Sequence, residues 1–573
     1  MLGNAFSKFL AFTAIAVVLS PIAKAQTEQN FIINYDIRYD VQDSGETLVS
    51  QTTTITSLKN DVVPTTYSFK TRYLDVYDIV AQTNGKKTEV RNEMPGKNET
   101  VITVPFSTYS IGEGKQNIVT MTYKTKGIAS RIGDVWNIYI QGIDTPETTT
   151  VYNIVLSVPP SMGPKIFVSP APATEKFENG KNNYYFTKES FSSKGVTAAF
   201  GKYQSLNYQI KYQLKNNRIL GSVYEVALPP DIQNIQQVRY ESIDPKPRKI
   251  RLDKDGNALA LFWVGPKSNL EVKLTGSAKI MGRQINPDFG GRITDLPKDL
   301  VREYTKNQRY WESNHDEIKN FAASLLDPNL NVSQNTKRVY EYISSNLTYD
   351  QTAASQNLVT RKGAVAALTQ RGAFTCMEFT DLFVATSRAM GIPAREINGY
   401  AFTNDNVGKP ISISLKGGDT LHSWAEYYDP FYGWVQIDPT WGTTSGTDYF
   451  TKLDTNHFAF VIKGKSSEYP YPAGAYSFSD DEKLVDIDFS GTSNSDEEFN
   501  PVLTVTKSIN INPLKLAQGY NRYIIDNTSG YFIYDLQGKT LAPGQKTGIY
   551  LKNGQTNVSI KDFRNKSYSV KIL

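Results

Sequence analysis

The chain has 573 residues and a formal net charge of +5, and 39% of its residues are hydrophobic. So small a charge gives no reason to expect a nucleic-acid partner, and the apolar and aromatic content excludes a disordered or fibrous chain. The single cysteine, Cys376, excludes an internal disulfide framework and cysteine-based zinc or iron–sulfur sites. We expect neither a metal nor a cofactor.

The first 25 residues have the three parts of a secretory signal peptide. Lys8 precedes the uncharged apolar residues 9–18, and the small-x-small sequence Ala-Lys-Ala occupies residues 23–25. The apolar run is short for a bilayer span of ~20 residues, and no second run reaches that length. We therefore expect residues 1–25 to be a signal peptide. The mature protein is then exported (secreted, periplasmic or on the cell surface), without a transmembrane segment.

Short runs of alternating residues, separated by turn residues, predict a β-sandwich over residues 26–160. Residues 33–39 and 117–123 are two such runs. A stretch rich in Pro and Gly at residues 158–164 indicates a boundary. A second β-rich domain is expected over residues 161–290.

Within that second domain, Asp255 and Gly256 predict a hairpin turn between two β runs. Asp253, Asp255 and Asn257 alternate there and raise calcium binding as an alternative. The EF-hand loop, however, requires a Gly at its sixth position and an acid at its twelfth. Neither requirement is met, so the pattern favours a plain hairpin.

The periodicity becomes helical near Thr294 and predicts an α+β domain over residues 295–465. Val339, Ile343 and Leu347 recur at helical spacing. A longer helix is predicted from Cys376 to Met390, because Gly391 and a following proline terminate it.

Cys376 is the first residue of this predicted helix. Thr375 and Glu378 have the spacing of a capping box. The unpaired N–H groups and positive dipole end of the first turn favour a thiolate at Cys376. The alternative is a buried and inert cysteine, and this segment alone does not decide between the two.

His422 and Asp438 lie on two β runs separated by turn residues. Centring the turn on Pro430 places His422 opposite Asp438, on one face, with Cβ atoms ~4.5–5.5 Å apart. A slip of one residue would put Asp438 on the other face. His422 alone would more often be structural, but the other two histidines, His315 and His457, lack such neighbours.

A helix-start cysteine with a strand histidine held by an aspartate is the arrangement of a thiol nucleophile. Cys376 attacks an amide or ester carbonyl, His422 exchanges the proton, and Asp438 fixes the imidazole tautomer. The backbone N–H of Cys376 can donate to the oxyanion. Trp424 and Gln436, expected to oppose each other on the His422 face, are candidates for a second donor or a cleft wall.

Residues 480–498 are strongly acidic, with Ser and Gly interspersed. This composition predicts a solvated linker, assigned to residues 466–500. Residues 501–573 return to short β runs and predict a β-rich C-terminal domain.

Three motifs, in order, resemble the transglutaminase-like superfamily. They occupy residues 372–400, 422–426 and 433–440. The resemblance covers about residues 335–445 and implies a papain-like α+β core with a Cys–His–Asp triad on the three residues named above. The neighbours of Cys376 differ from the Gln-Cys-Trp setting of animal transglutaminases, so microbial peptidases and amidases are nearer models than crosslinking enzymes.

The expected fold class is multidomain, with β-sandwich-like N-terminal domains, an α+β papain/transglutaminase-like core and a small all-β C-terminal domain. The leading hypothesis is an exported thiol-dependent acyl-transfer enzyme that hydrolyses or transamidates a peptide or amide bond. Its expected partner is a protein or peptide substrate, with a cell-envelope component as a further candidate. The alternative is a cell-envelope or surface binding scaffold whose transglutaminase-like domain is degenerate.

Overall fold

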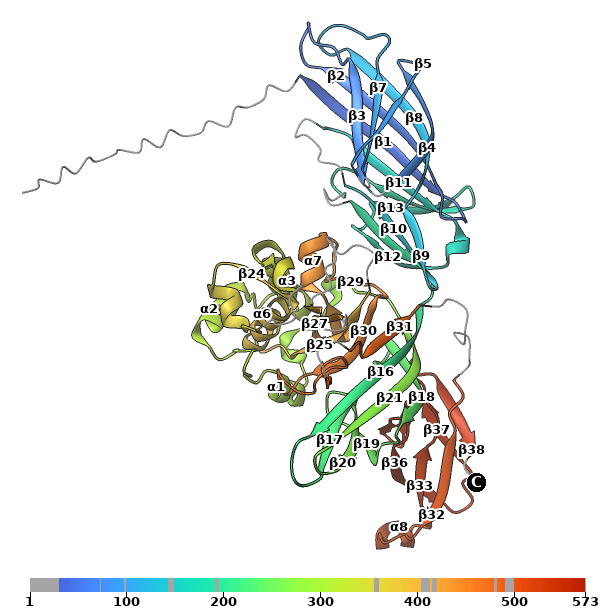
Figure 1. Ribbon diagram of the computed structural model, residues 1–573, viewed down its shortest axis with the longest axis vertical. Coiled ribbons are helices and arrows are strands. Elements are labelled where there is room, and N and C mark those ends of the chain that lie inside the picture. The colour runs from blue at the N-terminus through green and yellow to red at the C-terminus, as the bar shows by residue number, and fades with distance from the viewer. Residues whose placement is uncertain are drawn as a thin grey trace, which may run out of the picture.

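The computed structural model shows an elongated molecule in which β domains follow one another along the long axis and a helical domain lies to one side (Figure 1). Among the described residues, no helix is long and apolar enough to cross a membrane. The predicted signal peptide lies outside the described residues. The structure describes residues 30–72, 74–96, 99–142, 149–190, 195–354, 360–402, 413–414, 420–478, 482–489 and 499–571.

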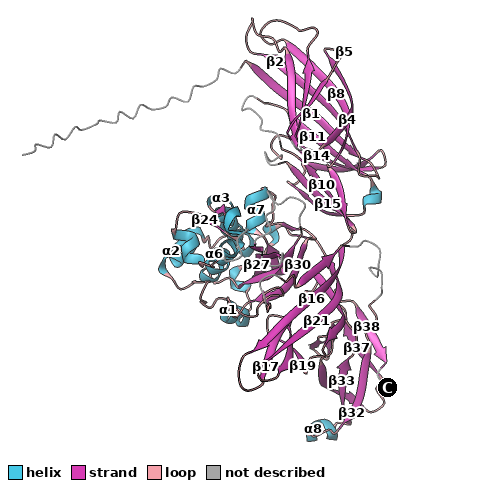
Figure 2. Ribbon diagram, in the orientation of Figure 1, coloured by secondary structure: helices cyan, strands magenta, loops and turns pink. Residues whose placement is uncertain are grey.

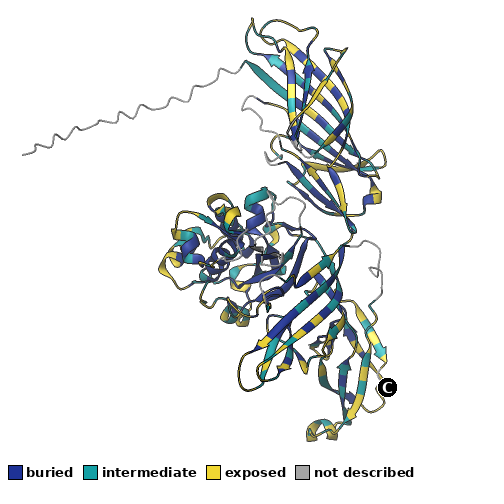
Figure 3. Cartoon of the chain, viewed as in Figure 1, coloured by how far each residue is buried: buried dark blue, intermediate teal, exposed yellow. Residues whose placement is uncertain are grey.

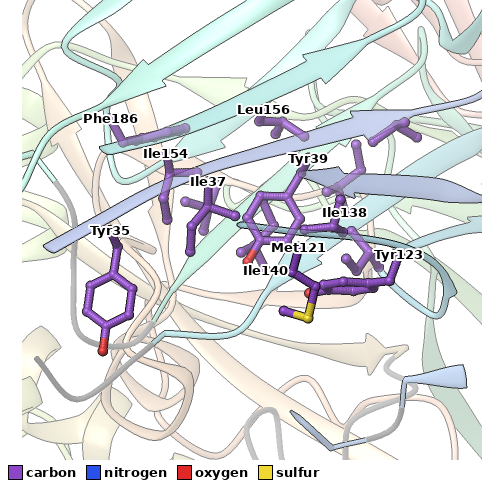
Figure 4. Close-up of a cluster of buried hydrophobic side chains, with 14 of the residues drawn as sticks. Tyr35, Ile37, Tyr39, Met121, Tyr123, Ile138, Ile140, Ile154, Leu156 and Phe186 are labelled. Atoms are coloured by element: carbon purple, nitrogen blue, oxygen red, sulfur yellow. The ribbon is translucent and has the colours of Figure 1, made fainter. Parts of the chain in front are cut away.

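The first domain is a β-sandwich, as its alternating runs predict. Its strands are β1 (Phe31–Val41), β2 (Thr47–Ser57), β3 (Thr66–Arg72), β4 (Asp75–Thr83), β5 (Lys86–Thr88), β6 (Arg91–Gly96), β7 (Glu99–Pro105), β8 (Gln116–Lys126), β9 (Ala129–Ile132), β10 (Val135–Ile140), β11 (Tyr152–Val158), β12 (Lys165–Ser169), β13 (Thr174–Glu178), β14 (Lys181–Phe186) and β15 (Val196–Phe200). The main sheet has the order β13-β14-β11-β1-β2-β8-β4-β5, and the smaller sheets are β12-β15-β10-β9 and β3-β7-β6. Alternate residues of β1, Tyr35, Ile37 and Tyr39, point into the core (Figure 4), because side chains of a strand alternate between its faces.

The boundary predicted at residue 160 is wrong. After the stretch at residues 158–164, which contains the short 3₁₀ helix η1 (Pro160–Met162), the chain returns to the same sandwich. β14 pairs with β11, and β15 pairs with β10. Proline and glycine make a turn here, and the non-local strand pairing extends the first domain to Phe200.

The second domain is a smaller sandwich of two sheets, β18-β21-β16-β31 and β17-β20-β19. Its strands are β16 (Gln204–Asn216), β17 (Ser222–Leu228), β18 (Gln236–Asp244), β19 (Lys249–Leu252), β20 (Ala258–Val264), β21 (Ser268–Ile280) and β31 (Val485–Asp488). The Asp255–Gly256 hairpin is confirmed, with Leu252 opposite Ala258. Strand β31 falls within the predicted linker 466–500; it pairs with β16, so this part of the acidic stretch is a strand and not a linker.

The helical domain packs its helices against a five-stranded sheet (Figure 2). Its elements are β22 (Arg283–Gln284), η2 (Pro287–Phe289), η3 (Ile293–Asp295), α1 (Lys298–Tyr304), α2 (Asp316–Leu325), α3 (Val332–Asn346), β23 (Thr348–Tyr349), α4 (Gln351–Ala354), α5 (Ala364–Thr369), β24 (Ala373–Phe374), α6 (Cys376–Ala389), β25 (Ala394–Ala401), β26 (Ile413–Ser414), β27 (Thr420–Asp429), β28 (Gly433–Ile437), α7 (Pro439–Ser445), β29 (Lys452–Leu453) and β30 (His457–Lys463). The sheet order is β26-β27-β25-β30, with β28 paired to β27. The long predicted helix is confirmed as α6, and its buried residues Phe379, Leu382 and Phe383 form the centre of this core.

Side chains of the second domain hydrogen-bond the backbone of β30. Gln236 exchanges two hydrogen bonds with Ala459, of 2.8 and 3.0 Å. Asn257 does the same with Ile462, at 2.8 and 2.7 Å. These amides satisfy backbone groups of an edge strand, where an unpaired buried N–H or C=O would be costly.

The C-terminal domain has two small sheets, β32-β33-β36 and β35-β34-β37-β38, as its β-rich sequence predicts. Its elements are β32 (Leu503–Ser508), α8 (Pro513–Ala517), β33 (Tyr520–Asn527), β34 (Ile533–Leu536), β35 (Lys539–Leu541), β36 (Lys546–Lys552), β37 (Asn557–Lys561) and β38 (Ser567–Lys571). The fold is therefore a multidomain, mostly-β architecture around one α+β core.

Candidate active site

Cys376 is the first residue of α6 and is fully buried. Glu378 ties the start of the helix: its carboxylate accepts hydrogen bonds from the backbone N–H and the hydroxyl of Thr375, at 3.0 and 2.8 Å. Its other oxygen accepts from the backbone N–H of Lys362 at 2.8 Å. The negative charge of Glu378 is thus held by donors of the cap, and the sulfur occupies the positive end of the helix dipole.

His422, on β27, and Asp438, at the end of β28, are joined by a hydrogen bond. His422 Nε2 lies 2.9 Å from Asp438 Oδ2, and both side chains are buried. The hairpin register is shifted by two residues from the predicted one, since Glu426 and not Trp424 opposes Gln436. A two-residue shift keeps every side chain on its face. Asp438 therefore reaches His422 as a diagonal neighbour.

Asp438 is also the N-cap of α7. Its Oδ1 accepts from the backbone N–H groups of Thr440 and Trp441, at 2.9 and 3.0 Å. One oxygen thus anchors the carboxylate to a helix start, and the other faces His422. Burial alone would raise the pKa of Asp438, but the charges and hydrogen bonds of His422 and His457 outweigh it and hold that pKa well below the ordinary value.

His457 is a site residue that the sequence prediction missed. Its Nε2 lies 3.2 Å from Asp438 Oδ2, and its Nδ1 lies 2.8 Å from Asp454 Oδ1. Burial lowers the pKa of His457, but the charge of Asp454 and the hydrogen bonds of both carboxylates raise it overall to about 9. His457 is therefore an imidazolium between two carboxylates at neutral pH. Asp438 accepts hydrogen bonds from two histidines, where the sequence predicted one.

Trp424 and Gln436, the candidates for the oxyanion or the cleft, bond to each other. The Trp424 indole N–H donates to Gln436 Oε1 at 3.1 Å. Trp424 also packs in a buried cluster with Ile397, Ala459 and Ile462. Its N–H is thus already used, whereas Gln436 Nε2 is buried with no hydrogen-bond acceptor among the described residues.

The sequence of this region matches a known family. Residues 319–439 match the sequence model of the Transglutaminase-like superfamily. This segment is the central part of the helical domain, which is therefore called the transglutaminase-like domain below. It contains α3, α6 and the β27–β28 hairpin, and therefore all three residues of the predicted triad.

Similar proteins are known from several bacteria. The chain is 25% identical over 307 residues to the uncharacterized protein YebA of Bacillus subtilis, covering 48% of this chain and 39% of that protein. It is 26% identical over 221 residues to the uncharacterized protein Rv2569c of Mycobacterium tuberculosis, covering 35% of this chain and 66% of that protein. The chain thus spans less than two thirds of the length of these relatives. A solved structure from Cytophaga hutchinsonii named "Putative Cysteine Protease" aligns with 50% of this chain and 98% of its own, at 16% identity and a TM-score of 0.30.

Aromatic rings surround His422 in the transglutaminase-like domain. The indole of Trp441 lies nearly parallel to the imidazole with ring centroids 5.3 Å apart, and that of Trp424 lies nearly parallel at 6.0 Å. Trp441 also contacts His457 at 4.6 Å. These contacts fix the plane of His422 and keep water from its hydrogen bond to Asp438, which strengthens that bond.

Among the described residues, one group could hold a metal ion by the spacing of its ligand atoms. It consists of His422, Asp438 and His457, whose ligand atoms lie within 4.8 Å of one another. Both imidazoles direct Nε2 at the same carboxylate oxygen, at 2.9 and 3.2 Å. These are hydrogen-bond distances, so two N–H···O bonds account for the arrangement without an ion.

An ionic cluster connects α6 to the sheet of the transglutaminase-like domain. Arg361 donates to Asp381 of α6 at 2.9 Å and to Glu396 of β25 at 2.5 Å. Lys463 of β30 lies 3.8 Å from Glu396. All four side chains are at most 10% exposed. The cluster therefore fixes the helix that begins with Cys376 relative to the strands beside it.

Proposed function

We propose that the protein is an exported thiol-dependent acyl-transfer enzyme that hydrolyses, or transamidates, a peptide or amide bond. Cys376 is its nucleophile, His422 its proton carrier and Asp438 its orienting carboxylate. The observation that carries this proposal is the buried 2.9 Å hydrogen bond between His422 and Asp438, in a domain whose only cysteine begins a capped helix. A transglutaminase-like family match over the same residues supports it.

The proposed reaction has two halves. The thiolate of Cys376 attacks the carbonyl carbon, and the backbone N–H of Cys376 donates to the oxyanion that forms. His422 then protonates the leaving amine, the C–N bond breaks, and a thioester remains. In the second half His422 removes a proton from water, or from an amine, which attacks the thioester and restores the thiol.

The geometry supports different roles for the two imidazole nitrogens of His422 in this proposal. Nε2 of His422 bonds to Asp438, so proton exchange with the substrate uses Nδ1. Asp438 stabilises the imidazolium that forms and does not itself take the proton, since its own pKa is held low.

The chain's single cysteine makes the test site-specific. The mature protein is treated with iodoacetamide between pH 4 and pH 9, and alkylation of Cys376 is followed by mass spectrometry. Because Cys376 is buried, the pH dependence of the labelling rate is compared and not the absolute rate. A nucleophilic thiolate reaches its full labelling rate below pH 7, and Asp438→Asn shifts this pH profile upward. Cys376→Ser, which removes the thiol, serves as the unlabelled control.

Turnover is measured on a library of quenched fluorescent peptides, with and without a primary amine donor. Release of new amine termini without a donor identifies a hydrolase, whereas product formed only with the donor identifies a transamidase. The alternative function, a cell-envelope binding scaffold with a degenerate site, predicts slow alkylation with the profile of an ordinary thiol and no turnover that depends on Cys376.

A further inference from the structure

The C-terminal domain ends in an apolar tip, residues 509–516, between β32 and β33. Four aliphatic side chains are exposed there, Ile509 by 80%, Ile511 by 81%, Leu514 by 74% and Leu516 by 58%. The tip contains α8 and lies at one end of the long axis of the molecule (Figures 1 and 3). Single exposed aliphatic residues are ordinary, but four within eight residues form a surface that water disfavours.

The tip is held in place by hydrogen bonds. Asn510 Nδ2 donates to the backbone oxygen of Tyr520 at 2.7 Å, and the Asn510 side chain accepts from the backbone N–H of Asn512 at 3.0 Å. Asn512 in turn caps α8 by accepting from the N–H of Lys515 at 3.1 Å. The polar groups of the tip thus bond inward to the backbone, and the aliphatic side chains point outward.

The domain that carries the tip is strongly basic. Residues 501–573 contain ten Lys or Arg residues but three Asp and no Glu. Two of the three aspartates are paired with lysines away from the tip, Asp526 with Lys546 and Asp535 with Lys561, at 2.8 Å each. The third, Asp562, bonds to two backbone N–H groups and to a tyrosine.

The cations beside the tip have no such partners. The register places Arg522 opposite Ser508 and Lys552 opposite Tyr520, at the end of the sheet where the tip begins. Lys515 and Lys552 lie over the ring of Tyr520, at 4.6 and 5.9 Å. Among the described residues, no carboxylate forms an ion pair with Arg522, Lys515 or Lys552, nor with Lys507, the penultimate residue of β32.

The geometry points to docking of this tip on an anionic phospholipid bilayer. Aliphatic side chains enter the boundary between headgroups and acyl chains, and flanking lysines extend to lipid phosphates, with Tyr520 at the level of the headgroups. A protein partner fits less well: protein interfaces are enriched in aromatic residues and depleted in lysine, whereas this tip combines Ile and Leu with lysines.

The full mature protein is mixed with large unilamellar vesicles of 70% phosphatidylcholine and 30% phosphatidylglycerol, and bound protein is measured by flotation. We expect the protein to bind these anionic vesicles, and to bind vesicles of pure phosphatidylcholine at least about tenfold more weakly. Binding to the anionic vesicles should weaken in 0.5 M NaCl. Replacing Ile509, Ile511, Leu514 and Leu516 together with serine should lower binding at least about tenfold. The control Ile111→Ser/Phe177→Ser removes side chains of similar exposure, 65% and 66%, from the first β domain, and should bind like the wild type.

Insertion is tested separately with Leu514→Trp. Emission at shorter wavelength and quenching by brominated lipids are expected on anionic vesicles. The inference is overturned if the wild type does not float with anionic vesicles, or if the fourfold serine variant, with an unchanged thermal transition, binds as well as the wild type. It is also overturned if the same four substitutions abolish self-association in solution and leave vesicle binding unchanged, because the tip is then a protein interface.

Discussion

Replacing His457 with glutamine tests the charge between Asp438 and Asp454. The pKa of this imidazole is raised from 6.5 to about 9 in the folded protein. Since one pKa unit corresponds to 1.36 kcal/mol, protonated His457 contributes about 3 kcal/mol to the free energy of unfolding. For a raised pKa this contribution is fully present below pH 6.5 and is lost as the pH rises through 9.

The measurement is the thermal transition of the transglutaminase-like domain at pH 6 and pH 9.5. Between these pH values the free energy of unfolding of the wild type should fall by about 3 kcal/mol more than that of His457→Gln. For a domain of this size this corresponds to a difference of about 6–12 °C in the shift of the transition midpoint. Other buried groups titrate in the same range, including Asp231, whose pKa burial raises to about 8, so the difference between wild type and variant is the quantity compared. His315→Gln, at the exposed start of α2, is the control and should keep the wild-type pH dependence. Equal pH dependence in wild type and His457→Gln would refute the proposed charge.

Three further substitutions test the site and its support. Asp438→Asn preserves the cap of α7 but removes the carboxylate charge, and kcat/KM on a peptide substrate should fall by about 10³–10⁴; a fall below tenfold would exclude the orienting role. Glu378→Ala leaves buried donors at the start of α6 without an acceptor, so chemical denaturation should show a free energy of unfolding lower by about 1–3 kcal/mol. An unchanged free energy of unfolding would mean that water replaces the carboxylate. Arg361→Met leaves two buried carboxylates without their guanidinium and should lower the free energy of unfolding by about 3–5 kcal/mol. Arg309→Met, at an exposed ion pair, should lower it by under about 1 kcal/mol. Equal losses in the two variants would contradict the importance of the buried cluster.

The local parts of the site were predictable because their signals are local. The capping box, the apolar face of α6 and Gly391 all lie within one helix and its ends, and the helix begins at Cys376 as predicted. For the hairpin, the sequence predicted that His422 and Asp438 lie on one face, but it did not predict the register of the two strands. Residues 429–433 allow the turn to be centred either on Pro430, as predicted, or on Phe431. The structure has the second turn, in which the side chain of Asp429 accepts hydrogen bonds from the backbone N–H groups of Phe431 and Tyr432.

The contact of His457 with Asp438 could not be predicted from the neighbours of His457 in the sequence. His457 reaches Asp438 because β30 pairs with β25, which in turn pairs with β27, and such pairing has no signature in a single chain. The Asp454-Thr-Asn-His457 spacing was the one available signal, since an aspartate three residues before a histidine can bond to its ring. The extent of the first domain escaped prediction for the same reason: β14 and β15 return to strands that precede the predicted boundary.

The β domains are part of the architecture that holds the candidate site. Leu421 and Phe458, each next to a site histidine, belong to the same buried core as Tyr208 and Val238 of the second domain. Gln236 and Asn257 bond to the backbone of β30, the strand that begins with His457. A transglutaminase-like domain separated from the second domain would therefore expose both an apolar surface and an edge strand, which favours aggregation. The position of His457 thus depends on a neighbouring domain that carries none of the triad residues.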